Sequence, residues 1–427
     1  MSQRDAPLTE PTTFRPLPTS VVLSPTTLGR ASAVTFTMPH APAGARAALL
    51  NVTASRSTTP TRISACAGTV VTAGCRETTG LTARPGSSGS SLVIAPLGGP
   101  NGNQTTLFNA LGDVTMTADL SGYFVTSTAA DTPLDSLLAP IATSAAVSEL
   151  DVRPGAGSVV DLPDVPPGAT AAIVDLEATG AATTTSLSVC PVGVGTDACT
   201  ATTALSTDGP QAQRNLVVVP LSTTSTSQIA IRSSDAAVRT SVAVQGYFVR
   251  GGDSSPAGRL YATNGPDLLA WQGIDAEHDV TLTLPRLPRG ALAVSLRVTG
   301  VSAGEPASLS VCPGSTSSAS CAQTGVVTVA PLEVAASNYT LVQLDPDDPT
   351  HVTLRATGSA VTVRVEMRGY VAPDAPGPGM PVGDRSPSAG VSSGTGSTTP
   401  TGPAVVPASP GAPQASTGST LSASSTG

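Results

Sequence analysis

The sequence predicts an all-β protein of three tandem antiparallel β-sandwich domains followed by a disordered tail. First, the segments SGYF, QGYF and RGYV recur, with Tyr123, Tyr247 and Tyr370 spaced by 124 and 123 residues. Second, apolar and polar residues alternate with a period of two, which is typical of strands with one buried face. Third, turn residues are frequent, with 42 Gly and 39 Pro, and no stretch inside the repeats keeps a helical period.

The recurrence divides the chain into five segments. We expect a disordered lead-in, three repeats and a tail, with the bounds 1–15, 16–126, 132–250, 257–373 and 374–427. The tail is almost all Pro, Ser, Gly, Thr and Ala, a composition that cannot bury a core and indicates a disordered linker. The short linkers TSTAAD and GGDSSPAG predict three units in a row like beads, each with its own core and with no need for cooperativity between them.

Four landmarks recur in the same order within each repeat. The first is a Pro/Gly turn entering a strand, as in MPHAPAGARAALLNVTAS, LPDVPPGATAAIVDLEAT and LPRLPRGALAVSLRVTG. The second is a cysteine pair. The third is an apolar run ending in proline, LVIAPL, LVVVPL and the less well kept LVQLDP, and the fourth is the closing strand with GYF or GYV. Turn signals at this spacing predict about seven to nine strands per repeat.

The closing strand predicts one buried and one solvated face. Its apolar positions in repeats 1 and 3 are Val114, Met116, Ala118 and Leu120, and Val361, Val363, Val365 and Met367. The alternating polar positions are Thr115, Thr117, Asp119 and Ser121, and Thr362, Arg364, Glu366 and Arg368.

The glycine that follows predicts a β-bulge or a close backbone approach. The aromatic ring after it can be buried if its hydroxyl group finds a partner. We interpret the motif as a structural lock and not as a ligand-stacking surface. The motif residues are Gly122, Tyr123, Phe124, Gly246, Tyr247, Phe248, Gly369 and Tyr370.

The six cysteines fall into three pairs, each nine positions apart and each within one repeat. They are Cys66 and Cys75, Cys190 and Cys199, and Cys312 and Cys321. One local disulfide per repeat is the favoured interpretation, ahead of free buried thiols and of zinc, for which no histidine lies near any pair. Each bridge would stabilise its repeat by about 2.5 to 3 kcal/mol in the chain-entropy model. Persistent disulfides require an oxidising compartment and so predict an extracellular or cell-wall-associated protein.

The first twenty residues contain no apolar core of the kind a signal peptide has. A signal that has been removed, another export route, or release of a virion by lysis would each account for this. No segment is apolar enough to span a membrane as a helix. The formal net charge is −8 and the 21 basic residues, all Arg, form no cluster, which argues against binding to nucleic acid.

The order ALLNVTAS, cysteine pair, NLVVVPL and GYF resembles the repeat modules found in exported actinobacterial proteins, often beside cell-wall hydrolases. The resemblance covers residues ~16–373, and repeat 3 departs from it with SLRVT and GYV. Such modules are regarded as non-catalytic appendages with no established common ligand. The resemblance therefore implies an exported, adhesive or structural protein and no particular chemistry.

Catalytic and metal-binding patterns are weak in this sequence, and we expect no enzyme activity, cofactor or metal. None of the three histidines, His40, His278 and His351, recurs between repeats. GVSAG at 300–304 matches a nucleophile elbow, but a turn and a strand follow it where a helix is required. DPDDP at 345–349 predicts a tight turn, with weak calcium binding as the lesser alternative. The single Trp271 is expected in the core more than on a sugar-binding surface.

Three functions are compatible with these features. The first is a non-catalytic spacer or adhesive module of the cell envelope, with weak multivalent binding to cell-wall polysaccharide or peptidoglycan. The second is the binding region of a cell-wall hydrolase or peptidase whose catalytic domain is absent from this chain. The third is a virion surface or tail protein.

Overall fold

The computed structural model describes residues 10–126, 135–250, 256–263, 267–302, 304–316, 325–330 and 335–373. Strands make up most of these residues, which confirms the all-β class. The described helices are two single turns, α1 (Ala73–Glu77) and α2 (Thr196–Thr200). The predicted tail and the linkers at 127–134 and 251–255 lie outside the described residues.

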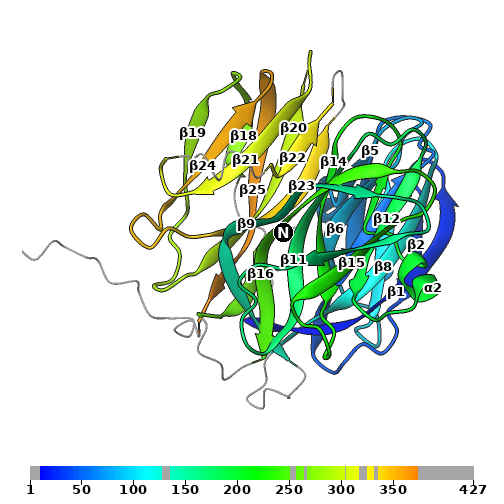
Figure 1. The fold of residues 1–427 in the computed structure, drawn as a ribbon, viewed down its shortest axis with the longest axis horizontal. Coiled ribbons are helices and arrows are strands. Elements are labelled where there is room, and N and C mark those ends of the chain that lie inside the picture. The colour runs from blue at the N-terminus through cyan, green and yellow to red at the C-terminus, as the bar shows by residue number, and fades with distance from the viewer. Residues whose placement is uncertain are drawn as a thin grey trace, which may run out of the picture. The chain divides into compact units, whose positions relative to one another are not determined.

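Repeat 1 is a sandwich of two antiparallel sheets (Figure 1). Its strands are β1 (Thr12–Leu28), β2 (Ala33–Thr37), β3 (Ala45–Ser55), β4 (Thr61–Ala67), β5 (Leu81–Ala83), β6 (Gly89–Pro96), β7 (Gln104–Asn109) and β8 (Val114–Thr126). The order is β1-β8-β3-β6 in one sheet and β2-β7-β4-β5 in the other. This order is that of an eight-stranded jelly roll. The first strand begins at Thr12, inside the predicted lead-in, because it pairs with β8 from that residue onward.

Repeat 2 has the same topology, with sheets β9-β16-β11-β14 and β10-β15-β12-β13. Its strands are β9 (Ser136–Val152), β10 (Gly157–Asp161), β11 (Ala169–Thr179), β12 (Thr185–Pro191), β13 (Leu205–Thr207), β14 (Gln213–Pro220), β15 (Gln228–Ser233) and β16 (Val238–Arg250).

Repeat 3 repeats the pattern, except that two strands, β17 and β18, replace the long first strand and pair in turn with β25. Its strands are β17 (Arg259–Ala262), β18 (Asp267–Ile274), β19 (Asp279–Thr283), β20 (Ala293–Val301), β21 (Ala307–Pro313), β22 (Val327–Val329), β23 (Ala336–Gln343), β24 (His351–Thr357) and β25 (Val361–Ala372). The second sheet is β19-β24-β21-β22.

Each repeat buries its own apolar core between its two sheets. The predicted alternation holds in β25, where Val361, Val363, Val365 and Met367 are buried and the residues between them are not. In β8 the prediction of a solvated face is wrong for Asp119 and Ser121, which are each 3% exposed. They are covered because another repeat packs against this face of the sheet, as the hydrogen bonds described below show.

A fourth apolar cluster contains residues from all three repeats. Phe14 of β1 lies with its ring centroid 4.1 Å from that of Phe248 of β16 and 5.3 Å from that of Phe124 of β8. Ala47, Ala171 and Ala293, which occupy matching positions in the three repeats, are fully buried in it. The expected row of independent beads is therefore wrong, because the repeats share a core.

The first strands of the three repeats also pair with one another. Thr12 pairs with Leu260, and Phe14 pairs with Ser136. Leu138 forms a bridge with Gly258 through two backbone hydrogen bonds of 2.8 and 2.9 Å. These pairings join one sheet from each repeat into a continuous 13-stranded sheet.

Candidate functional site

The GYF motif contains a β-bulge that re-aims the residues after it. Between β3 and β8 the register slips by one residue, so that Leu49 pairs with Gly122 and Leu50 with Leu120, leaving Ser121 as the extra residue. The same slip occurs at Gln245 in repeat 2 and Arg368 in repeat 3. An extra residue reverses the alternation of faces.

Because of this reversal, the tyrosine and the phenylalanine serve different cores. Tyr123 and Tyr247 belong to the cores of their own repeats. Phe124 and Phe248, and Val371 at the matching position of repeat 3, belong to the shared cluster. The motif therefore closes each jelly roll and attaches it to its neighbours.

The glycine of the motif is required by a close approach of the first strand. A Cβ atom at Gly246 would lie 2.9 Å from the carbonyl oxygen of Ala139, and one at Gly369 would lie 2.9 Å from that of Tyr261. At Gly122 the nearest atom is again a backbone carbonyl oxygen, that of Arg15. Backbone atoms cannot swing aside as a flexible side chain can, so a larger residue would push the strands apart.

The buried tyrosine hydroxyl groups have the partners that burial requires. Tyr123 donates a hydrogen bond of 2.5 Å to the carbonyl oxygen of Pro39, and Tyr247 donates one to that of Pro163. Burial raises the pKa of both tyrosines, so both stay neutral donors. In repeat 3 the ring of Tyr370 is stacked on that of Tyr261 at 4.9 Å.

The structure contains disulfides between Cys66 and Cys75 and between Cys190 and Cys199. Cys312 is also disulfide-bonded, while Cys321 lies outside the described residues. In repeats 1 and 2 the second cysteine is buried in a single-turn helix, α1 or α2. The bridge therefore fixes the loop that follows this helix.

This loop of repeat 2 is clamped onto the sheet of repeat 1 four residues after the second cysteine. The Thr203 amide donates a hydrogen bond of 2.8 Å to Asp119 Oδ2, and Asn51 Nδ2 donates one to the Thr203 carbonyl oxygen. Asn51 and Asp119 are cross-strand partners on β3 and β8. Asn215 of repeat 2 adds a hydrogen bond of 2.6 Å to Asn51 Oδ1.

Burial raises the pKa of Asp119 to about 6, because the loss of hydration outweighs the hydrogen bond from Thr203. The carboxylate is thus an ionisable group held at a contact between repeats.

The matching loop of repeat 3 also forms a hydrogen bond with the sheet of repeat 2, through a residue of β14. Gly325, also four residues after a second cysteine, accepts a hydrogen bond of 2.8 Å from Arg214 Nη1 through its carbonyl oxygen. The Arg214 guanidinium also pairs with Asp175, at 3.1 Å, and with Glu177. Burial raises the pKa of Asp175 by more than the charge of Arg214 lowers it. The contact at Gly325 therefore contains ion pairs, whereas the contact at Thr203 consists of hydrogen bonds between amide groups and the Asp119 carboxyl group.

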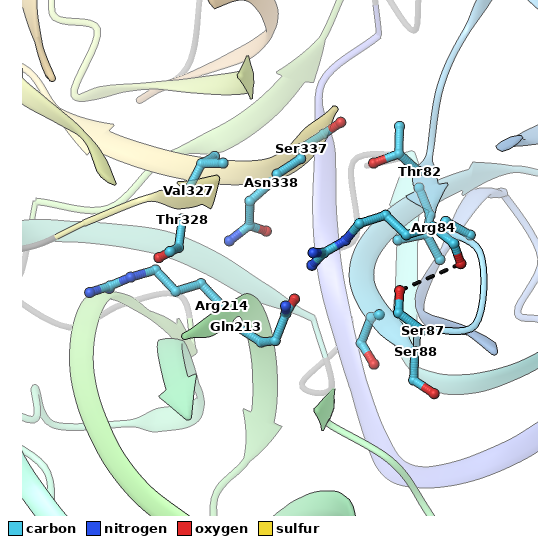
Figure 2. Close-up of a pocket in the computed structure, with 15 residues that line it drawn as sticks. Thr82, Arg84, Ser87, Ser88, Gln213, Arg214, Val327, Thr328, Ser337 and Asn338 are labelled. Atoms are coloured by element: carbon cyan, nitrogen blue, oxygen red, sulfur yellow. Dashed lines mark hydrogen bonds between the residues drawn. The ribbon is translucent and has the colours of Figure 1, made fainter. Parts of the chain in front are cut away.

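A narrow polar pocket of about 40 Å³ lies where the three repeats meet. Figure 2 shows Arg84 of repeat 1 extending between Gln213 of repeat 2 and Asn338 of repeat 3, while Arg214 turns toward Thr328. The nearby Ser87 hydroxyl donates to the Arg84 carbonyl oxygen at 3.5 Å. Since Arg214 is held by carboxylates, this pocket is mainly a packing feature of the junction.

The third contact, between repeat 1 and the sheet of repeat 3, leaves a cleft. The loop residue Thr79 of repeat 1, again four residues after a second cysteine, lines this cleft. Trp271 of β18 lines it from repeat 3 and is 52% exposed. The prediction of a core tryptophan is therefore wrong, because Trp271 lies in a register slip between Leu269 and Gln272, where β18 departs from β25.

Other residues singled out in the sequence are not brought together as a site. His40 and His278 are exposed, and His351 Nδ1 lies within hydrogen-bond distance of Asp348 Oδ1, at 2.6 Å, in the predicted DPDDP turn. Ser302 of GVSAG is buried and donates to the Glu305 carbonyl oxygen at 2.7 Å, and the next element is strand β21. Within the described ranges, no group of three metal-ligating side chains occurs. No helix among the described residues is long and apolar enough to span a membrane.

Comparison with known proteins yields no family. No protein-family model matches the chain, and no curated protein matches it. A solved structure described as "The Triple Jelly Roll Fold and Turret Assembly in an Archaeal Virus" is similar with 11% identity and a TM-score of 0.16, over 83% of this chain and 91% of the other. The infectious bursal disease virus VP2 subviral particle follows with 11% identity and a TM-score of 0.13, over 87% and 83%. Similarity at this level assigns neither a fold family nor a function.

Proposed function

We propose that the protein is a non-catalytic module of the actinobacterial cell exterior, which acts as a rigid spacer and adhesive unit on the cell envelope. The observation that carries this proposal is the apolar cluster shared by all three repeats, built around Phe14, Phe124 and Phe248. A shared core couples the repeats, so that force or denaturing conditions act on one body and not on three weakly linked beads.

The disulfides support the same proposal. In repeats 1 and 2 the bridge holds a loop that lies beside, or is bonded through its backbone to, a neighbouring repeat, at Thr79 and Thr203. Stabilised contacts of this kind suit a protein that works outside the cell, where disulfides persist and chaperones do not rescue unfolded chains. The resemblance of ALLNVTAS, NLVVVPL and GYF to exported actinobacterial repeat modules points to the same location.

The proposal is tested by co-sedimentation of the oxidised protein with purified actinobacterial cell walls, before and after enzymatic removal of the secondary polysaccharide. An unrelated acidic protein of similar size sets the background. We expect sedimentation with intact walls and its loss with the polysaccharide. Background-level sedimentation with both wall preparations would overturn the adhesive role.

A further inference from the structure

At the cleft between repeats 1 and 3, repeat 3 has no counterpart of the Asn51–Asp119 clamp, and the Thr82 hydroxyl group donates a hydrogen bond of 2.8 Å to the Ala335 carbonyl oxygen beside the cleft. The cross-strand pair Asn51 and Asp119 of repeat 1 corresponds to Arg297 and Glu366 of repeat 3. Glu366 does not bind the neighbouring loop in the way that Asp119 does. It pairs instead with Arg368 at 2.8 Å and with Arg364 at 3.2 Å.

Arg297 is the second departure from the clamp. Its side chain is 1% exposed, yet none of its three guanidinium nitrogens has a hydrogen-bond partner among the described residues. Its guanidinium carbon lies 5.7 Å from the centre of the Tyr339 ring. Burial lowers its pKa to about 10, so it still carries a positive charge at neutral pH. A buried, unpaired cation is costly, and a nearby anion would offset that cost.

The wall of the cleft carries an exposed aromatic ring found in one repeat alone. The register places Ile274 opposite Val361 and Leu28 opposite Val114, so Trp271 corresponds to Pro25 of repeat 1. Trp271 and Leu111, which is 46% exposed, both line the cleft. Its volume is about 560 Å³, which lies in the range of small-ligand pockets.

Polar groups surround this apolar surface and are mostly positive. Arg62 from β4, together with Arg364 and Glu366 from β25, lines the cleft. Arg364 is bound by Asp267 at 2.9 Å, and the charges of Arg364 and Arg368 act on the nearby Arg297. With Arg297 and Arg368, which do not line the cleft, four guanidinium groups in this region stand against the carboxylates of Asp267 and Glu366, in a chain whose formal net charge is −8. The local field favours an anion.

We propose that this cleft binds an anionic oligosaccharide, with one sugar ring on the face of Trp271 and an acidic group beside Arg62 and Arg364. Sugar rings present C–H groups that pack on an aromatic face, and their hydroxyl groups suit the carboxylate of Glu366 and the surrounding threonines. Carboxylate on a guanidinium forms strong, charge-assisted hydrogen bonds. The proposal goes beyond the spacer role, since it assigns one defined site per molecule at one boundary between repeats.

Calorimetric titration with α-1,4-linked tetragalacturonate tests the proposal, with neutral maltotetraose as the matched probe. Trp271 is the only tryptophan in the chain, so its fluorescence reports the same event independently. We expect tetragalacturonate to bind, to change the emission, and to bind more weakly as salt is raised. No binding, or equal binding of the neutral probe, would overturn the proposal.

Variants locate the site. Trp271→Ala is expected to weaken tetragalacturonate binding about tenfold or more, Trp271→Phe to restore part of it, and Arg62→Gln to weaken it and reduce its salt dependence. The controls are Val159→Ala and Arg239→Gln, at exposed positions of repeat 2, which should leave binding unchanged. Full binding by Trp271→Ala with an unchanged melting temperature would place the site elsewhere and overturn the assignment.

The outcomes also separate this site from the spacer role. If the wild-type protein does not sediment with cell walls but binds tetragalacturonate, the adhesive function alone is overturned. Wall sedimentation that persists in Trp271→Ala, with tetragalacturonate binding absent in the wild type, would overturn the cleft alone.

Discussion

A single methyl group is enough to test the close approach at the closing strand. Gly246 lies under the Ala139 carbonyl oxygen, so Gly246→Ala forces two backbone segments apart. We expect it to lower the free energy of unfolding by about 1 to 3 kcal/mol, measured by urea denaturation.

The matched control is Gly273→Ala. Gly273 is also in a strand, but a Cβ atom there would meet nothing within 4 Å. Its substitution should change stability by less than about 1 kcal/mol, because alanine fits this open position and restricts the unfolded chain. Equal losses for both variants would show that the close approach is unimportant.

The tyrosine hydroxyl group is tested by Tyr247→Phe. Removing it leaves the Pro163 carbonyl oxygen without this donor beside a buried ring. The expected cost is about 1 to 2 kcal/mol in the free energy of unfolding, with an unchanged β-sheet circular dichroism spectrum. An unchanged unfolding midpoint would mean that water replaces the hydroxyl group without loss.

At this scale, the sequence was informative where local chemistry decides the structure. The glycine before the aromatic residue predicted a bulge or a close approach, and the structure has both at Gly122 and Gly246. The prediction for Trp271 was wrong because a tryptophan in the core and a tryptophan in a register slip look the same in the sequence. The cue was that Trp271 does not recur in repeats 1 and 2, whereas core positions do.

At the scale of strands, one face of each closing strand packs inside its repeat and the other faces a neighbour. A period of two reveals which residues share a face, but not what covers that face. Asp119 and Ser121 on β8 therefore looked solvated in the sequence and are buried in the structure. Buried polar faces of this type need partners from outside their own sheet, and here repeat 2 provides them.

The buried Asp119 predicts a pH dependence of stability. Its pKa is about 6 in the folded protein, against 3.8 for an unperturbed aspartate. A folded-state pKa above the unfolded value means that its contribution is complete below pH 3.8 and is lost as the pH rises to about 6. This group alone favours folding at pH 4 over pH 7 by roughly 2 to 3 kcal/mol.

Asp119→Asn isolates this effect in urea unfolding measured from pH 4 to pH 8. Asparagine keeps an oxygen that can accept the Thr203 amide and cannot ionise. The variant should gain stability at pH 7 and show a flatter pH profile over this range. Asp113→Asn, at an exposed position, is the control. A wild-type slope retained in Asp119→Asn would assign the dependence to another group, such as Asp175.

For the whole molecule, the fold of each repeat was predictable and their association was not. The two-residue period, the turn signals and the cysteine spacing are features of one repeat, so they predict the sandwich and its disulfides. The shared cluster depends on the surfaces of three repeats fitting together, with residues such as Phe14, Ala171 and Ala293 drawn from each. Neither the two-residue period nor the linker length contains that information, which is why beads were expected.

The shared cluster predicts that residues 10–373 unfold as one unit. Differential scanning calorimetry should give a single transition whose calorimetric and van't Hoff enthalpies agree. Phe14→Ala should cost about 3 to 5 kcal/mol and shift that whole transition. Three resolved transitions, with one moved by Phe14→Ala, would restore the bead arrangement.

The covalent connection between the repeats has a consequence for how this molecule can diversify. In a symmetric assembly of three separate identical chains, a mutation that opens one boundary opens all three and weakens the whole particle. Fusion of the copies into one polypeptide removes that constraint. Two boundaries are bonded through Thr203 and Gly325, while the third, where Thr82 donates to the Ala335 carbonyl oxygen, keeps the cleft with Trp271 and still shares the common core. A single chain of three repeats can therefore change one boundary between repeats while the other two keep their contacts.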